Sequence, residues 1–233
     1  MVISEYSDKV VRVIDPETWS SFRVGGGSYC YSSNMAACSG PGDTTDVSKP
    51  SGVALTGDGS VAFFTTISSH GHTIFKIDLG SDAASSTVTL LAGKPNKKGD
   101  EDGVGTDARF DDPADIATNV DGTTLFIANT DENQIKRMDV ASRQVVTMVN
   151  LGSSIRPSTI AVTPDGSEVY FFAALYYQST SDLRKISSAT SCTSCTATTL
   201  YPGVITGGAS TPHTGTLSLT KDAQQVIITN TNK

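Results

Sequence analysis

The sequence lacks the long apolar segments of membrane-spanning proteins. Only 18% of its 233 residues are charged, yet it contains no run of the roughly 18 apolar residues that a transmembrane helix needs. Met1 leads directly into a short apolar segment and not into a signal peptide. We therefore expect no membrane insertion, and we expect any secretion signal to lie upstream of Met1.

Basic residues are also scarce. The chain has 17 Lys and Arg against 24 Asp and Glu, which gives a net charge of −7. Its densest basic run, Lys94, Lys97 and Lys98, is followed at once by the acidic residues 100–102. Polyanion binding needs clustered, uncompensated Lys and Arg, so we expect no nucleic-acid partner.

Several catalytic signatures are missing. The sequence holds no Gly-x-Ser-x-Gly nucleophile elbow, no phosphate-binding P-loop and no cysteine with a convincing histidine partner. Histidine occurs only three times and tryptophan once, and no Asn-x-Ser/Thr glycosylation site is present. We therefore predict neither a nucleophilic triad nor an N-glycan.

One sequence phrase is repeated. It begins with Pro and ends with Asp-Gly in residues 50–59, 113–122 and 157–166, and a looser copy spans residues 212–222. A short apolar segment follows each copy, at residues 61–64, 125–128, 169–172 and 226–229. Asp-Gly between two β-rich segments predicts a hairpin, because Gly accepts the positive φ of a tight turn.

Each repeat continues with two further predicted strands. Third strands are expected at residues 74–78, 135–139 and 183–186, and fourth strands at residues 87–91, 145–149 and 198–201. No segment shows a sustained helical period. Repeated four-stranded antiparallel units predict an all-β protein with a β-propeller fold. We expect one domain, residues 1–233, with blades at about residues 50–91, 113–149 and 157–201.

Both ends of the chain match the middle of a repeat. Residues 3–15 align without a gap on residues 127–139, so residues 2–24 are predicted to form a partial blade without its first strand. Residues 212–233 are predicted to form a second partial blade. Either the two ends share one blade in a four-bladed ring, or the chain is a piece of a larger propeller. We favour the second interpretation.

Residues 90–149 resemble an NHL repeat. The resemblance rests on Leu91-Ala-Gly93, on a Gly-rich acidic insertion ending in Ala108-Arg-Phe110-Asp-Asp-Pro113, and on the segment 129–137 after the hairpin. The other repeats resemble the family more loosely. Because NHL propellers are usually six-bladed, the resemblance implies that this chain forms part of a six-bladed ring.

Four cysteines form two close pairs, Cys30 with Cys38 and Cys192 with Cys195. Each pair falls within one Ser-, Gly- or Thr-rich connection, so local disulfides are the simplest prediction. A zinc site would require the two pairs to meet, and free thiols would require a reducing compartment. Disulfides indicate an extracellular or secreted protein.

Two groups of residues are candidate metal ligands. His70 and His72 are close enough in sequence to share a zinc ion, with His213 as the remaining histidine, but we favour an exposed hairpin loop as the explanation of the pair. The densest acidic stretch could supply oxygen ligands for calcium, the candidate cofactor, although the matching tract of NHL proteins is mainly structural. Its acidic residues are Asp100, Glu101, Asp102, Asp107, Asp111, Asp112 and Asp115.

Other Asn and Asp residues are predicted to stabilise turns. Segment 129–133 lies between two strands and is rich in Asn and Asp, which cap nearby backbone groups. The hairpin residues Asp58, Asp121, Asp165 and Asp222 are interpreted in the same way.

These patterns favour a non-catalytic extracellular propeller that binds a protein partner or joins neighbouring domains. The alternative is a calcium- or zinc-dependent lyase or hydrolase with its site at the central pore. Three or more His, Asp, Glu or Asn side chains lining the pore would favour the enzyme.

Overall fold

The computed structural model contains β-strands grouped into five antiparallel sheets. The residues it describes are 1–5, 8, 10–15, 17–25, 38–45, 47–175, 180–187, 189–192, 194–206, 215–220 and 225–230. Within these residues a short 3-10 helix spans Gly105–Asp107. No helix in this part of the chain is long and apolar enough to span a bilayer.

The first and second sheets contain the N-terminal strands. The first sheet consists of β1 (Val2–Glu5), β2 (Val10–Ile14) and β3 (Ser21–Val24), in that order. The second sheet has the order β4-β8-β7-β6-β5, and its strands are β4 (Gly40–Pro41), β5 (Pro50–Leu55), β6 (Val61–Thr66), β7 (Thr73–Asp78) and β8 (Thr87–Gly93).

The third sheet repeats this arrangement. Its order is β10-β11-β12-β13-β9, with β9 (Gly103–Val104), β10 (Pro113–Thr118), β11 (Thr124–Asn129), β12 (Gln134–Asp139) and β13 (Gln144–Asn150). The prediction of four strands per repeat is therefore incomplete for two sheets. In each of them a two-residue strand from the preceding insertion pairs with the outermost strand.

The fourth and fifth sheets complete the described chain. The fourth has the order β14 (Ile155–Val162), β15 (Glu168–Leu175), β16 (Thr180–Ser187) and β17 (Ala197–Thr206). The fifth contains β18 (Gly215–Leu219) and β19 (Val226–Asn230).

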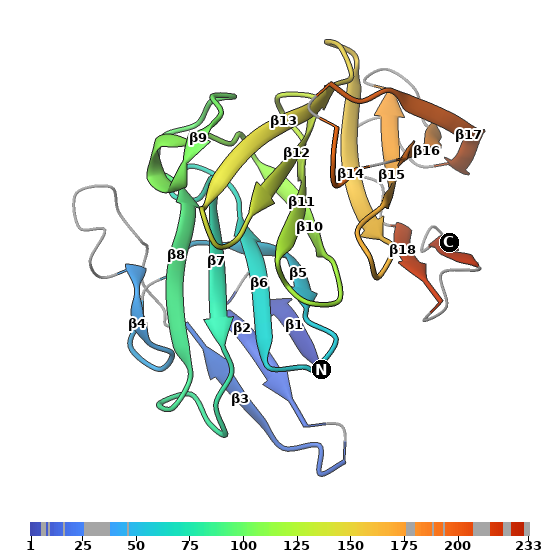
Figure 1. Cartoon of the computed structure of the whole chain (residues 1–233). Coiled ribbons are helices and arrows are strands. Elements are labelled where there is room, and N and C mark those ends of the chain that lie inside the picture. Colours follow the sequence, from blue (N-terminus) through green and yellow to red (C-terminus); the bar gives the residue numbers. More distant parts are fainter. Residues whose placement is uncertain are drawn as a thin grey trace.

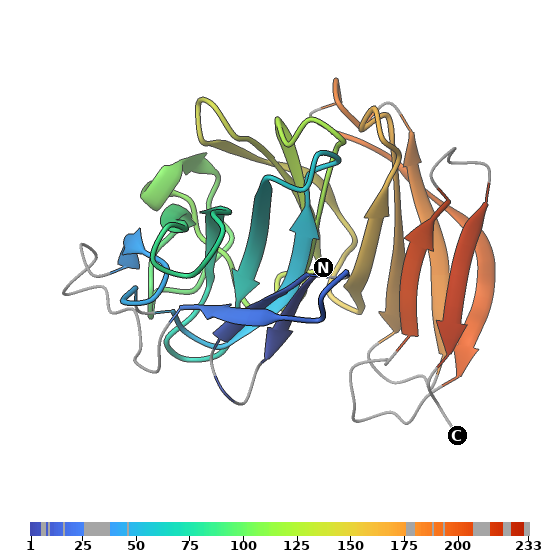
Figure 2. The same cartoon turned by 90° about the horizontal axis from the view of Figure 1, so that it is seen from below.

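The sheets follow one another in sequence order around an arc (Figures 1 and 2). Their first strands lie side by side, with β5 packed against β10, β10 against β14 and β14 against β18. β1 packs against β5 at one end of the arc. In the described residues β19 pairs with β18, whereas β1 to β3 form a separate sheet. Among the described residues, no strand of the first sheet pairs with β18 or β19.

The hydrophobic core is divided among the seams between successive sheets. Phe63 and Phe64 are adjacent in β6 and point to opposite faces, because side chains alternate along a strand. Phe64 packs with residues of the first sheet, and Phe63 packs with residues of the third. Phe171 and Phe172 in β15 make the same division between the third and fifth sheets. This burial on both sides explains why the second strand of each repeat is continuously apolar.

The hairpins also give the arc two faces. The connections between first and second strands, and between third and fourth strands, lie on one face, here called the turn face. The other connections, including residues 67–72 and the insertion 94–112, lie on the connector face. This division follows from the antiparallel order of the strands.

Candidate functional site

The turn face is stiffened by the repeated Asp-Gly hairpins. In the first hairpin the Thr56 hydroxyl donates to Asp58 Oδ1 at 2.6 Å, and the Ser60 N–H donates to the same oxygen at 3.0 Å. These bonds hold the pKa of Asp58 down at about 2. Asp165 has the same partners in Thr163 and Ser167, and its pKa is also about 2. These two aspartates are turn residues, as predicted.

The third sheet builds its hairpin differently. There Asn119 Oδ1 accepts the N–H groups of Thr123 and Thr124, both at 3.0 Å. The turn is therefore held by Asn119 and not by the predicted Asp121. Gly122 still takes the expected positive φ of 69°.

Adjacent hairpins are joined by a ladder of backbone hydrogen bonds. The Gly57 N–H donates to the Val120 carbonyl at 2.9 Å, and the Val120 N–H donates to the Pro164 carbonyl at 2.8 Å. A Cβ on Gly57 would lie 2.3 Å from Val120 Cγ2, so a larger residue at position 57 would force the Val120 side chain to move. The ladder fixes three successive turns relative to one another.

Apolar side chains lie exposed on this rigid face. Leu55 is 39% exposed and Val120 is 46% exposed. Trp19, in the connection between β2 and β3, is 74% exposed. We name Leu55, Val120 and Trp19 the apolar turn-face residues; their exposure was not predicted from the sequence.

The first strands contain an inter-sheet contact built around Asp115. In β5, β10 and β14 the register shifts after a proline, which leaves backbone N–H groups outside the regular ladder. Asp115 Oδ1 accepts the N–H of Ile116, and its Oδ2 accepts the N–H of Ile160 on β14, both at 2.9 Å. Asp115 keeps some solvent contact, but its burial between strands raises its pKa to about 7.

The predicted histidine pair is separated by the structure. His72 is 5% exposed, so the expectation of an exposed loop is wrong for this residue. Its ring lies beside the two carboxylates that precede β10, with Nδ1 3.7 Å from Asp111 Oδ1 and 3.5 Å from Asp112 Oδ1. His70 is not part of this group, and His213 lies outside the described residues.

The acidic insertion has a structural role at its centre. Lys136 is fully buried, and its Nζ donates to the Asp100 carbonyl and Asp102 Oδ1, both at 2.7 Å, and to Thr147 Oγ1 at 2.9 Å. Asp102 also accepts the Thr147 N–H, and these bonds keep its pKa low against the opposing effect of burial. Asp107 lies in the 3-10 helix outside this network. The structure therefore does not assemble Asp100, Asp102 and Asp107 into one ligand set.

Segment 129–133 forms the predicted turn, but Asn129 does more than cap its own backbone. The Asn133 N–H donates to the Thr130 carbonyl at 3.2 Å, which closes the turn. Asn129 is fully buried, and its Oδ1 accepts the N–H of Asp111 at 2.8 Å. This bond ties the end of the insertion to β11.

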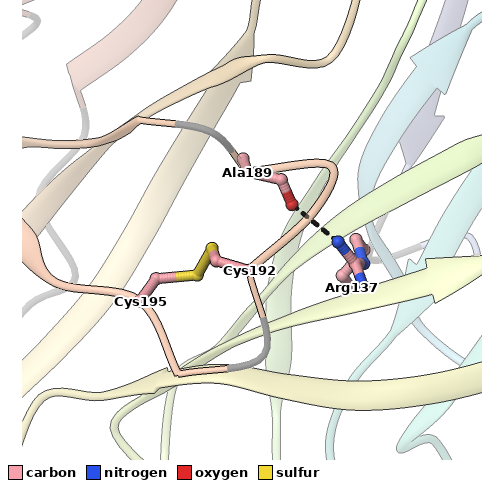
Figure 3. The surroundings of a disulfide bond; sticks show 4 residues. All are labelled: Arg137, Ala189, Cys192 and Cys195. Atoms are coloured by element: carbon pink, nitrogen blue, oxygen red, sulfur yellow. Dashed lines mark hydrogen bonds between the residues drawn. A yellow bond between two sulfur atoms is a disulfide. The ribbon is translucent and has the colours of Figure 1, made fainter.

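Cys192 and Cys195 are joined by a disulfide in the connection between β16 and β17 (Figure 3). The same connection is tied to the third sheet, because Arg137 Nη1 donates to the Ala189 carbonyl at 2.8 Å and the Cys195 N–H donates to the Met148 carbonyl at 2.7 Å. Cys38 is buried and disulfide-bonded. Its predicted partner, Cys30, lies outside the described residues.

The architecture is identified by comparison with solved structures and not by comparison of sequences. No protein-family model matches the sequence, and no curated protein matches it. The NHL resemblance therefore stays a prediction.

Solved structures, in contrast, match nearly the whole chain. One from a nidogen/laminin complex has a TM-score of 0.63 at 11% identity, covering 98% of this chain and 69% of that chain. The Cps50 (Swd1) β-propeller domain of Myceliophteria thermophila has a TM-score of 0.54 at 11% identity, covering 99% and 62%. Hydrazine synthase of Kuenenia stuttgartiensis has a TM-score of 0.57 at 16% identity, covering 86% and 46%.

The chain has a β-propeller fold. It spans about half of the hydrazine synthase chain that it matches. At these identities the likeness establishes the fold alone, and the predicted all-β propeller of antiparallel sheets is confirmed.

Proposed function

We propose that the chain is a non-catalytic extracellular module that binds a protein partner through its turn face. The observation that carries the proposal is the exposure of Leu55 and Val120 on two hairpins that backbone hydrogen bonds lock together. Rigid exposed apolar side chains favour binding, because they lose little conformational freedom when a partner covers them.

Three further observations support the proposal. The net charge of −7 disfavours polyanions. One of the similar folds comes from a complex between two proteins, nidogen and laminin. The Cys192–Cys195 disulfide is typical of an oxidising, extracellular compartment.

The alternative of an enzyme with a pore site requires several converging polar side chains. Asp115 in β10 is the third residue of the repeated sequence phrase. The equivalent residues are Gly52 in β5 and Thr159 in β14, and neither is a carboxylate. One carboxylate with both oxygens already accepting backbone N–H groups supports the binding module better than the enzyme.

The test compares capture of partners by matched variants. Wild type, Val120→Lys and Val104→Lys are immobilised and exposed to extracellular fluid from the native source. Val104 is 52% exposed and lies on β9, at the opposite edge of the third sheet from β10. We expect a protein that is enriched on wild type and on Val104→Lys to be lost on Val120→Lys. Equal enrichment on all three proteins would contradict the proposed face.

A further inference from the structure

The connector face holds a compact group of metal-ligand atoms from two sheets. His72 Nδ1, one oxygen of Asp111 and one of Asp112 all lie within 4.8 Å of one another. The two distances from Nδ1 are 3.5 and 3.7 Å. A tetrahedral zinc site with ligand distances of about 2.1 Å separates its ligand atoms by about 3.4 Å. The group is therefore close to the spacing that a small divalent cation needs.

The ligand atoms are held in place by the surrounding backbone. Asp112 Oδ1 accepts the Ser68 N–H at 2.7 Å, which joins the insertion to the connection between β6 and β7. The bond between the Asp111 N–H and Asn129 fixes the neighbouring carboxylate. Such supporting contacts orient ligands before a metal arrives and reduce the cost of binding.

Charge also favours a cation at this position. The side chains of His72 and Asp111 are 6% and 8% exposed, whereas that of Asp112 is 37% exposed. The positive side chain nearest to Asp111 in the described contacts is Lys98, whose Nζ lies 3.0 Å from Asp111 Oδ2 and whose side chain is 70% exposed. One solvent-exposed ammonium is a weak counter-charge for two clustered carboxylates.

Two existing contacts compete with a metal ion. Lys98 occupies Asp111 Oδ2, and the Asp112 N–H donates to His72 Nδ1 at 3.1 Å. A bound cation must displace the second contact, so the Asp111–Asp112 peptide has to shift slightly. Replacement of Lys98 should then increase the affinity for the metal. If the cluster is purely structural, the same change should not produce tighter metal binding.

We propose that His72, Asp111 and Asp112 bind a first-row divalent cation such as Zn²⁺ and that this ion joins the second and third sheets. The mixed nitrogen and oxygen donors suit zinc better than calcium, which prefers six to eight oxygens. Because Asp112 borders solvent, water completes the coordination. The site lies on the connector face and does not depend on the turn face binding a partner.

The experiment is a titration of untagged, chelator-treated protein with ZnCl₂ followed by calorimetry, with Co²⁺ absorption as a probe of coordination. The variants are His72→Asn and Asp112→Asn, because both positions have positive φ and Asn tolerates that conformation. His70→Asn is the matched control, and Lys98→Met removes the competing ammonium.

We expect one Zn²⁺ per chain, at least tenfold weaker binding by His72→Asn and Asp112→Asn, unchanged binding by His70→Asn and tighter binding by Lys98→Met. A tetrahedral Co²⁺ spectrum should be lost in the two ligand variants. If His72→Asn does not fold, Asp112→Asn and Lys98→Met still decide the matter. Equal affinity in wild type and these variants, or no stoichiometric binding by wild type, would overturn the proposal.

Discussion

The Asp115 carboxylate accepts the Ile160 N–H at 2.9 Å and so links the first strands of the third and fourth sheets. Burial outweighs its two accepted hydrogen bonds and raises its pKa to about 7, whereas an unfolded aspartate has a pKa of about 3.9. The fold therefore favours the protonated form. The stabilisation that follows is fully present below about pH 4 and is lost as the pH rises toward 7.

The loss of this stabilisation with rising pH gives the first prediction. The difference in unfolding free energy between wild type and Asp115→Asn should fall by a few kcal/mol between pH 4 and pH 7 and then level off. Urea unfolding of both proteins across this range measures it, and the other titrating groups cancel in the difference. A difference that does not vary with pH would show that Asp115 has an ordinary pKa.

Gly52 makes the matching contact on the other side of Asp115. A Cβ at residue 52 would lie 2.5 Å from both Cα and Oδ1 of Asp115. We expect Gly52→Ala to lower the unfolding free energy by about 2–3 kcal/mol, because a backbone atom cannot move aside cheaply. Gly103→Ala is the comparison, since the nearest atoms there, backbone atoms of Asp107 and Ala108, are 3.1 Å away and need to move less, so it should cost less than Gly52→Ala. Equal costs in chemical denaturation would contradict the close packing at Gly52.

Lys136 provides a third prediction. Lys136→Ala should cost about 3–5 kcal/mol, because it leaves Asp102 and the Asp100 carbonyl without their buried partner. Lys76→Met is the comparison, since Lys76 pairs with Asp78 near the surface and should contribute less than about 1 kcal/mol. Thermal and urea unfolding measure both variants. Similar losses of unfolding free energy in the two would show that Lys136 is solvated and not buried.

The Cys192–Cys195 disulfide closes a very short loop. Its removal in the double variant Cys192→Ser, Cys195→Ser should lower the unfolding free energy by about 2 kcal/mol, as expected from the loop length. Intact-mass measurement of the wild type with and without reductant, followed by peptide mapping, tests the bond itself. Free thiols at both positions in protein from the native source would weaken the extracellular proposal.

Local sequence signals predicted the strands well. The Asp-Gly turns and alternating apolar residues lie within ten residues of one another, so they predicted β5 to β8 and β10 to β13 nearly at their observed bounds. In the fourth sheet β15, β16 and β17 are longer than predicted. The structure adds that Phe63 and Phe64, adjacent in β6, are buried on opposite sides of the sheet.

Long-range contacts explain what the sequence did not reveal. Lys136 is buried because the insertion folds back over it and supplies Asp100 and Asp102 as its partners, a contact that no local pattern reveals. His72 meets Asp111 only because consecutive sheets bring the two connections together. β9 is too short to carry a strand pattern, and its partner β13 lies about 40 residues later.

The central claim is that Val120 lies in a protein-binding face. The direct measurement places the photocross-linker benzoylphenylalanine at residue 120 and, in a second protein, at residue 104, which is similarly exposed on the outermost strand of the third sheet. After irradiation in native extracellular fluid, mass spectrometry identifies the cross-linked proteins and peptides. We predict one dominant partner linked from residue 120 and little or none of it linked from residue 104. The same yield and the same proteins from both positions would contradict a binding face at the hairpins.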